Sequence, residues 1–286
     1  DLFIGTDFDI TTFPWTGKIY YFENTSVTDD DEWTLIDSDF IEYDLGNNLA
    51  IDFVDIDNDN DNDIFVGDFN GYVQVIKNIG TAELPEFTYH EQIDDIDLSG
   101  YSVPKLADID LDNDYDLFIG DSMGKISYYE NQGSNIEYDF VFVTNNYQNI
   151  SVGGRAAPDF IDLDNDNDFD LVVGSQYNGI QYYENVGNAY NPEYVENNNF
   201  TFSNVGLNTF PSFSYDTHSL LVGISTGGIY SMTLNSCIPG DVNNDLIVNV
   251  IDIIQVINFI LLDYQENSDF LCLADMNYDS IINVID

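Results

Sequence analysis

The residues best suited to chemistry are aspartates that recur at alternate positions in three short segments. The first reads "DIDNDNDND" (Asp55–Asp63), and close copies begin at Asp108 and Asp162. Positions 1, 3, 5 and 9 offer side-chain carboxylates, and the aspartate at position 7 offers its backbone carbonyl. Position 6 is always asparagine, which readily adopts positive φ. The candidate metal ligands are Asp55, Asp57, Asp59, Asp61, Asp63, Asp108, Asp110, Asp112, Asp114, Asp116, Asp162, Asp164, Asp166, Asp168 and Asp170.

Carboxylates crowded in this way need a cation. Two of them about 4 Å apart repel by roughly 4 kcal/mol at an effective dielectric of 20. The segments contain no His or Cys, and oxygen-only ligand sets select hard ions. Ca²⁺ accepts six to eight oxygen ligands, whereas Mg²⁺ retains its waters. The pattern therefore predicts three calcium loops. The alternative is an acidic loop that is simply solvated. The recurrence of the aspartates at the same positions in three segments argues against it.

The composition is that of a folded, strongly acidic protein. The 286 residues include 53 acidic and 5 basic ones, giving a formal charge of −48. Nucleic acid is excluded as an expected partner, because phosphate binding needs basic surface. Hydrophobic residues make up 44% and aromatic residues 15%, far more than in disordered acidic chains. No apolar run reaches the roughly 18 residues of a membrane helix. Both ends cut through motifs, so we expect the sequence to be an internal fragment.

Short apolar segments position the aspartates. The pattern "DIFVG" (Asp63–Gly67) recurs at Asp116–Gly120, Asp170–Gly174 and Asp1–Gly5, and in degenerate form at Ser219–Gly223. Its glycines at 67, 120 and 174 are 53 and 54 residues apart. Each copy precedes a second piece such as "GKISYYEN". The apolar residues are β-branched or aromatic and lie in short runs bounded by Gly, Asn and Asp, which is typical of strands and turns.

The repeat predicts the fold class. Each unit contains a strand entering the Asp-rich loop ("PKLADID"), a short buried strand ("DLFIG"), an alternating strand ("KISYYEN") and a more variable outer strand ("DFVFVT"). Four antiparallel strands repeated at this interval predict a mainly β protein, a β-propeller of about five blades or part-blades. The alternative is a β-sandwich with accidental internal similarity.

Residues 1–235 resemble the FG-GAP and VCBS repeats of integrin-like bacterial propellers. The resemblance rests on Asp-x-Asp-x-Asp-Asn-Asp-x-Asp-apolar-x-x-Gly followed by Gly-x-x-x-Tyr-Tyr-x-Asn. Two copies depart from it. The last has Asp216 out of register, so we expect no metal there, and the first retains only Asp1.

The segment 236–286 is a separate domain by its pattern. "DVNNDLIVNVID" and "DMNYDSIINVID" begin at Asp241 and Asp275, 34 residues apart. Both place oxygen-bearing side chains at positions 1, 3, 5, 9 and 12, the spacing of an EF-hand loop, in which position 7 supplies a backbone carbonyl. The candidate ligands are Asp241, Asn243, Asp245, Ile247, Asn249, Asp252, Asp275, Asn277, Asp279, Ile281, Asn283 and Asp286.

This duplicated motif, followed by an apolar helix, resembles a type I dockerin, a small α-helical module that plugs into cohesin-bearing scaffolds. Position 6 departs from the usual glycine, being Leu246 in the first loop and Ser280 in the second. A left-handed leucine costs about 1–2 kcal/mol, which puts tight calcium binding by the first loop in question. Cys237 and Cys272 precede the two loops by similar distances and either pair as a disulfide or remain free thiols.

The helix after the first loop suggests a docking surface. Its polar residues repeat at three-residue steps, and the opposite side, including Ile253, Ile254 and Ile257, is expected to bury against the second loop. Apolar residues that project into the polar face either meet a partner or pack on the propeller. The dockerin resemblance favours a cohesin and implicates two repeat positions, here Ile251 and Leu262. The candidate partner-binding residues, in both repeats, are Ile251, Phe259, Leu262, Val284 and Ile285.

Catalysis finds little support in the sequence. Neither His90 nor His218 lies beside a repeated nucleophile or carboxylate pair. Aromatic side chains can stack on sugar rings, and the candidates are Trp15, Trp33 and the repeated tyrosines. The alternative for the tyrosines is packing between blades. We expect a non-catalytic, calcium-binding propeller, extracellular or at a cell surface, which binds a polysaccharide, protein or surface ligand and docks to a cohesin. The alternative is an accessory region of a polysaccharide-degrading enzyme whose catalytic domain lies upstream.

Overall fold

The computed structural model describes most of the predicted propeller and three residues of the C-terminal segment. The described residues are 1–7, 15–25, 33–94, 96, 98, 100–163, 166–197, 206–214, 219–233, 253–254 and 257. They form 18 strands and one short 3₁₀ helix, η1 (Tyr147–Asn149).

Three antiparallel sheets have four strands each, hydrogen-bonded in chain order. These are the complete repeat units, and each follows the predicted sequence of strands. Their strands are β4 (Ala50–Val54), β5 (Asp63–Gly67), β6 (Val73–Asn78) and β7 (Phe87–Gln92); β8 (Val103–Ala107), β9 (Asp116–Gly120), β10 (Ile126–Asn131) and β11 (Phe140–Thr144); and β12 (Ala157–Ile161), β13 (Asp170–Gly174), β14 (Ile180–Asn185) and β15 (Tyr194–Glu196).

Two further sheets have three strands each among the described residues. In the first, the strands match the second to fourth strands of a complete unit, and in the last they match the first three. Their strands are β1 (Leu2–Gly5), β2 (Ile19–Asn24) and β3 (Trp33–Asp37), and β16 (Phe210–Ser214), β17 (Ser219–Gly223) and β18 (Ile229–Thr233).

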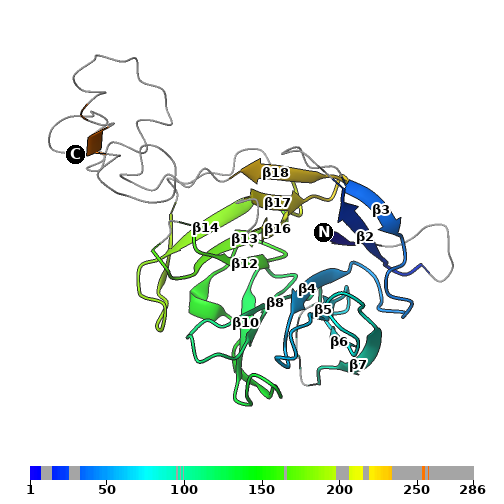
Figure 1. Cartoon of the computed structure of the whole chain (residues 1–286). Coiled ribbons are helices and arrows are strands. Elements are labelled where there is room, and N and C mark those ends of the chain that lie inside the picture. Colours follow the sequence, from blue (N-terminus) through cyan, green and yellow to red (C-terminus); the bar gives the residue numbers. More distant parts are fainter. Residues whose placement is uncertain are drawn as a thin grey trace.

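The five sheets lie side by side around a common centre in chain order (Figure 1). The first strands of successive units, β4, β8, β12 and β16, are neighbours and line that centre. The described part of the chain is therefore mainly β, a five-bladed propeller-like arrangement, as the sequence predicts.

The core lies between adjacent blades. All nine apolar side chains of 64–66, 117–119 and 171–173 are fully buried, which confirms the prediction made for the "DIFVG" motif. The tyrosines of the second piece belong to the same packing. Tyr129, Tyr182 and Tyr183 are buried, and Tyr128 stacks on Phe118 with ring centroids 4.8 Å apart.

The glycine that closes the motif marks the contact with the next blade. A Cβ on Gly120 would lie 2.1 Å from the carbonyl oxygen of Ala156. The equivalent glycines, Gly5, Gly67 and Gly174, show the same conflict with a carbonyl oxygen of the next blade, at 2.1–2.2 Å. At Gly223, in the last described sheet, the nearest atom would be 3.8 Å away. The glycine is thus required by close packing of one blade on the next.

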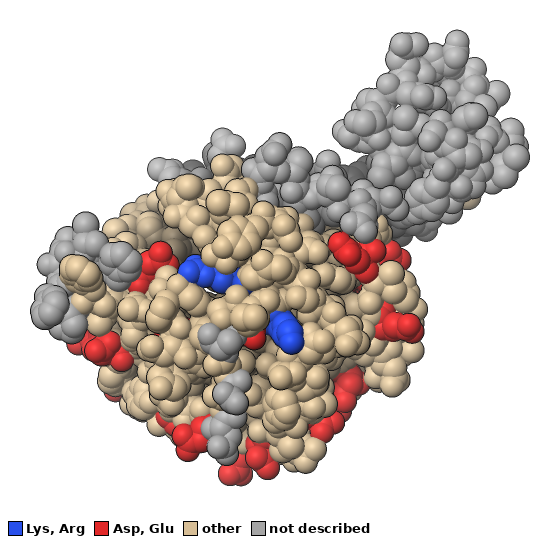
Figure 2. Space-filling view, turned by 180° about the vertical axis from the view of Figure 1, so that it is seen from behind, with Lys and Arg blue, Asp and Glu red and all other residues tan. Residues whose placement is uncertain are grey.

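The acidic residues are distributed around this body. Seen from behind, Asp and Glu surround the periphery, while Lys and Arg show at only two places near the middle of that face (Figure 2). No helix among the described residues is long and apolar enough to cross a membrane.

Candidate metal centre

Each Asp-rich loop joins the first strand of a complete blade to the second, so the three loops share one rim of the propeller. The first aspartate organises each loop. Asp55 accepts hydrogen bonds from the backbone N–H groups of Asp59, at 3.1 Å, and of Asn60, at 3.0 Å. The equivalent bonds to Asp108 and Asp162 are 3.1–3.2 Å long. These bonds coil the backbone so that alternate side chains no longer point along a flat strand.

The coiled backbone requires left-handed residues, and asparagine supplies them. Position 6 has φ of 72° at Asn60, 73° at Asn113 and 70° at Asn167, as predicted. Position 4 is also left-handed, with φ of 57° at Asn58 and 59° at Leu111. The sequence interpretation missed this second site, although the asparagine at 58 was a signal for it.

The loops bring together the carboxylates at positions 1, 3 and 5. Ligand oxygens of Asp55, Asp57 and Asp59 lie within 4.8 Å of one another, and those of Asp108, Asp110 and Asp112 do the same. At that separation two charges repel by about 3.5 kcal/mol at an effective dielectric of 20, before screening by solvent and salt. In the third loop Asp162 and Asp166 are described, whereas Asp164 lies outside the described residues.

Buried carboxylates lie beside these clusters. Asp61 and Asp63, at positions 7 and 9, are 5% and 1% exposed. Asp61 Oδ1 and Asp63 Oδ2 have no hydrogen-bond partner among the described residues. Burial, together with the charges of Asp57 and Asp59, raises the pKa of Asp63 to about 7. Burial likewise raises the pKa of Asp116, in the second loop, to about 7. These oxygens lie in an environment that disfavours their charged form unless a cation is present.

The donor set fits a hard divalent cation. Ca²⁺ coordination uses converging carboxylates, and it also uses buried oxygens such as those of Asp61 and Asp63, which have no partner among the residues that the structure describes. A bound ion would remove the repulsion and would pair these oxygens. The side chains at positions 1, 3 and 5 would hold the ion. No histidine or cysteine competes for softer metals within these loops.

The first and second loops differ at a neighbouring strand position. Lys77 Nζ lies 2.8 Å from Asp57 Oδ2 in the first loop. The corresponding residue beside the second loop is Glu130. Burial is the main cause that raises the pKa of Asp114 to about 6, and the negative charges of Asp112 and, to a smaller extent, Glu130 contribute. We therefore expect the first loop to bind a cation more weakly than the second, since Lys77 must give up its contact.

The aspartate at position 9 has a second task that the sequence interpretation missed. Asp63 Oδ1 accepts a hydrogen bond from the backbone N–H of Asn78 at 2.7 Å. The side-chain oxygen of Asn78 then accepts from Gly80, at 3.0 Å, and Glu86, at 2.9 Å, which closes the outer hairpin. The same arrangement recurs at Asp116 and Asn131 and at Asp170 and Asn185. The asparagine that ends each of these pieces ("VIKN" in the first unit, "YYEN" in the other two) was the available signal.

The predicted C-terminal sites lie outside the described residues. These are the two EF-hand-like loops, the cysteines at 237 and 272, and the five candidate partner-binding residues. Of the helix predicted after the first loop, Ile253, Ile254 and Ile257 are described. They are 58%, 51% and 47% exposed. This exposure differs from the burial predicted for this side of the helix. The second loop, against which the three residues were expected to pack, lies outside the described residues, so that contact stays a prediction.

Of the remaining aromatic and histidine candidates, His90 and Trp15 are exposed, Trp33 is half-buried, and His218 lies outside the described residues. His90 is exposed, and its Nε2 lies 3.8 Å from a carboxylate oxygen of Glu91. Trp15 is 60% exposed, and Trp33 opens the outer strand of the first sheet.

Comparison with known families identifies the C-terminal segment. Residues 239–286 match the family model described as the dockerin type I domain. No curated protein matches the chain. The described residues thus form a five-bladed, propeller-like β arrangement, and the segment 239–286 that follows it matches the dockerin type I domain.

Proposed function

We propose that this chain is a non-catalytic, calcium-stabilised propeller that a dockerin attaches to a cohesin-type partner, outside the cell or at its surface. The match of residues 239–286 to the dockerin type I model carries the docking part of the proposal. In this arrangement the propeller binds the ligand, and the dockerin attaches the chain to its cohesin-type partner.

Calcium binding by the propeller is supported by geometry. Carboxylates converge in two loops, the same backbone hydrogen bonds occur in all three, and two buried oxygens of the first loop lack a described partner. These features, with the five sheets, also support assigning residues 1–235 to the FG-GAP/VCBS type of repeat.

The docking proposal is tested with a panel of purified type I cohesins, by calorimetry in calcium and in EDTA. We expect the chain to bind at least one cohesin only in calcium. The variant Ile251→Asp/Leu262→Asp should abolish binding and leave melting of the propeller unchanged. Ile136→Asp, at a 62% exposed site in an outer hairpin, is the matched control and should bind normally.

Two outcomes contradict this proposal. If no cohesin binds and the double variant destabilises the propeller, the apolar residues pack on the propeller instead. If binding persists in the double variant, the contact lies elsewhere on the chain.

A further inference from the structure

A cavity of about 320 Å³ opens between the second and third complete blades, on the rim that carries the Asp-rich loops. Its volume is at the lower end of the range for small-molecule sites. Side chains from two Asp-rich loops and three inner strands enclose it. The lining residues are Lys105, Leu106, Ala107, Asp108, Leu111, Tyr115, Asp159, Phe160, Phe169 and Phe213.

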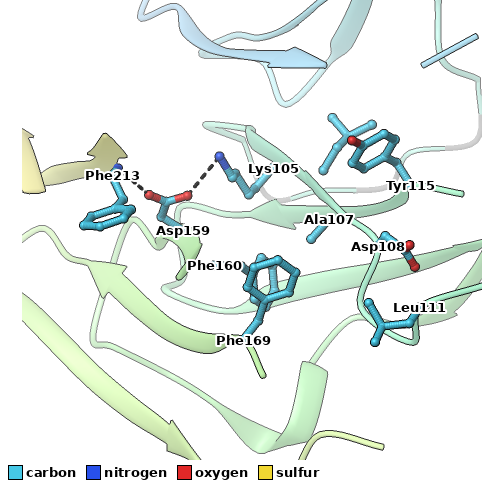
Figure 3. Close-up of a pocket in the computed structure, with 10 residues that line it drawn as sticks. Lys105, Ala107, Asp108, Leu111, Tyr115, Asp159, Phe160, Phe169 and Phe213 are labelled. Carbon is cyan, nitrogen blue, oxygen red and sulfur yellow. Dashed lines mark hydrogen bonds and ion pairs between the residues drawn. The ribbon is translucent and has the colours of Figure 1, made fainter. Parts of the chain in front are cut away.

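One end of the cavity is polar and fixed (Figure 3). Asp159, 3% exposed, accepts hydrogen bonds from Lys105 Nζ at 2.9 Å and from the backbone N–H of Phe213 at 2.8 Å. Lys105 Nζ also contacts Asp52 Oδ1 at 3.1 Å. An ammonium group has three N–H donors, so one remains for a ligand, and each carboxylate oxygen retains a lone pair. This end therefore offers both a donor and acceptors.

Apart from Asp108, which lies near Tyr115 and Leu111, the other walls are aromatic and apolar (Figure 3). Phe160 and Phe169 lie together along one side, and Tyr115 and Leu111 lie at the end opposite Lys105 (Figure 3). Tyr115 and Phe169 occupy position 8 of their loops, where the first loop has Asn62. Aromatic faces carry partial negative charge and attract C–H groups that carry partial positive charge.

Leu111 has the left-handed conformation that the coiled loop requires at position 4, where a leucine is a costly residue. Its φ of 59° is left-handed, which costs a leucine about 1–2 kcal/mol, and its side chain is 42% exposed. Asn58 adopts the same conformation in the first loop at little cost. A costly residue type beside a cavity points to a functional role, and the exposed apolar side chain of Leu111 is available for contact with a ligand.

Charge narrows the class of ligand. Lys105 between Asp52 and Asp159 leaves this group of three with a net negative charge, and the whole chain has a formal charge of −48. Anions are therefore repelled. A cation that reaches the polar end meets Lys105, which the two carboxylates keep protonated. A neutral ring fits both parts of the cavity. Hydroxyl groups at its edge can hydrogen-bond to the polar end, and C–H groups on its faces can pack on the aromatic walls.

We propose that this cavity binds one ring of a neutral sugar, held between Tyr115, Leu111 and the phenylalanines with its hydroxyl groups toward Lys105 and Asp159. This inference rests on the proposed role of the propeller as the ligand-binding part of the chain. It assigns to that role a site and a chemical class.

The test converts the second loop to the residues of the first. Leu111→Asn/Tyr115→Asn reproduces Asn58 and Asn62, so it keeps the backbone chemistry of a loop that already folds. The single variant Tyr115→Asn serves if the double variant is destabilised. Tyr177→Asn, at a 63% exposed site in the turn between β13 and β14, is the matched control. Calorimetry in calcium measures binding of neutral di- to hexasaccharides, uronic-acid oligosaccharides and tetramethylammonium.

We expect wild type and Tyr177→Asn to bind a neutral oligosaccharide, and Leu111→Asn/Tyr115→Asn to bind it at least about tenfold more weakly. Sugar binding that is equal in all three proteins overturns the cavity assignment and leaves the ligand-binding role of the propeller intact. Wild type that binds only tetramethylammonium or only uronic acids overturns the neutral-sugar class. Wild type that binds none of the probes overturns this inference, while the docking proposal is decided separately by the cohesin measurement.

Discussion

Replacing Lys105 by methionine should destabilise the propeller far more than the loss of one surface ion pair. Lys105 Nζ lies 3.1 Å from Asp52 Oδ1 and 2.9 Å from Asp159 Oδ1, so it joins the inner strands of three successive blades. Each contact is worth about 5.5 kcal/mol of Coulomb attraction at an effective dielectric of 20, most of which offsets the cost of desolvating the charges.

Backbone hydrogen bonds keep the carboxylates of Asp52 and Asp159 in place when the lysine is removed. The backbone N–H of Leu106 donates to Asp52 Oδ2, and that of Phe213 donates to Asp159 Oδ2, both at 2.8 Å. Removing one partner of such a buried group leaves uncompensated charge and costs about 3–5 kcal/mol. We expect Lys105→Met to lower the free energy of unfolding by this amount at pH 8.

Urea unfolding in calcium, followed by circular dichroism, measures the loss. Lys18→Met is the matched control, because Lys18 Nζ lies 2.9 Å from Asp39 Oδ2 and Asp39 is 49% exposed. It should cost less than about 1 kcal/mol. A loss for Lys105→Met as small as that of the control would refute the reasoning. Lys105→Met/Asp159→Asn should recover part of the stability, since asparagine keeps an acceptor for Phe213 without the charge.

Three further predictions concern calcium, packing and the cysteines. Without calcium, Asp63 and Asp116 have a pKa of about 7 in the folded protein and near 3.8 when unfolded, so the folded state binds more protons between these values. The melting temperature of the EDTA-treated protein should therefore fall as pH rises from about 4 to about 7, and added calcium should reduce this slope; a rise with pH would contradict the assignment. Gly120→Ala should cost about 3 kcal/mol in urea unfolding because its Cβ meets the carbonyl of Ala156, whereas Gly223→Ala should be nearly neutral; equal effects would argue against the inter-blade role of the motif glycine. Thiol titration of the unfolded, unreduced chain should find no free thiol, and two titratable thiols would exclude the disulfide.

The sequence by itself determined the repeating unit and its local chemistry. Strand patterns, the buried "DIFVG" segments and the positive φ of Asn60, Asn113 and Asn167 follow from residues within about ten positions of one another, and the structure confirms them. The convergence of positions 1, 3 and 5 in two loops was predictable for the same reason, because alternate side chains of a coiled loop point inward. The dockerin motif is similarly local, and the family match identifies it without any contact between distant segments.

Only the tertiary structure decided what the blades build between them. Three inner strands carry Asp52, Lys105 and Asp159 at equivalent positions. These residue types do not indicate that one lysine forms ion pairs with two carboxylates more than fifty residues away on either side. The cavity of about 320 Å³ has the same origin, since Tyr115, Phe169 and Phe213 come from three units. Contacts of this kind depend on how neighbouring blades approach each other. The motif glycines such as Gly120 permit the close approach, but no local pattern of residues encodes which side chains then meet across the blades.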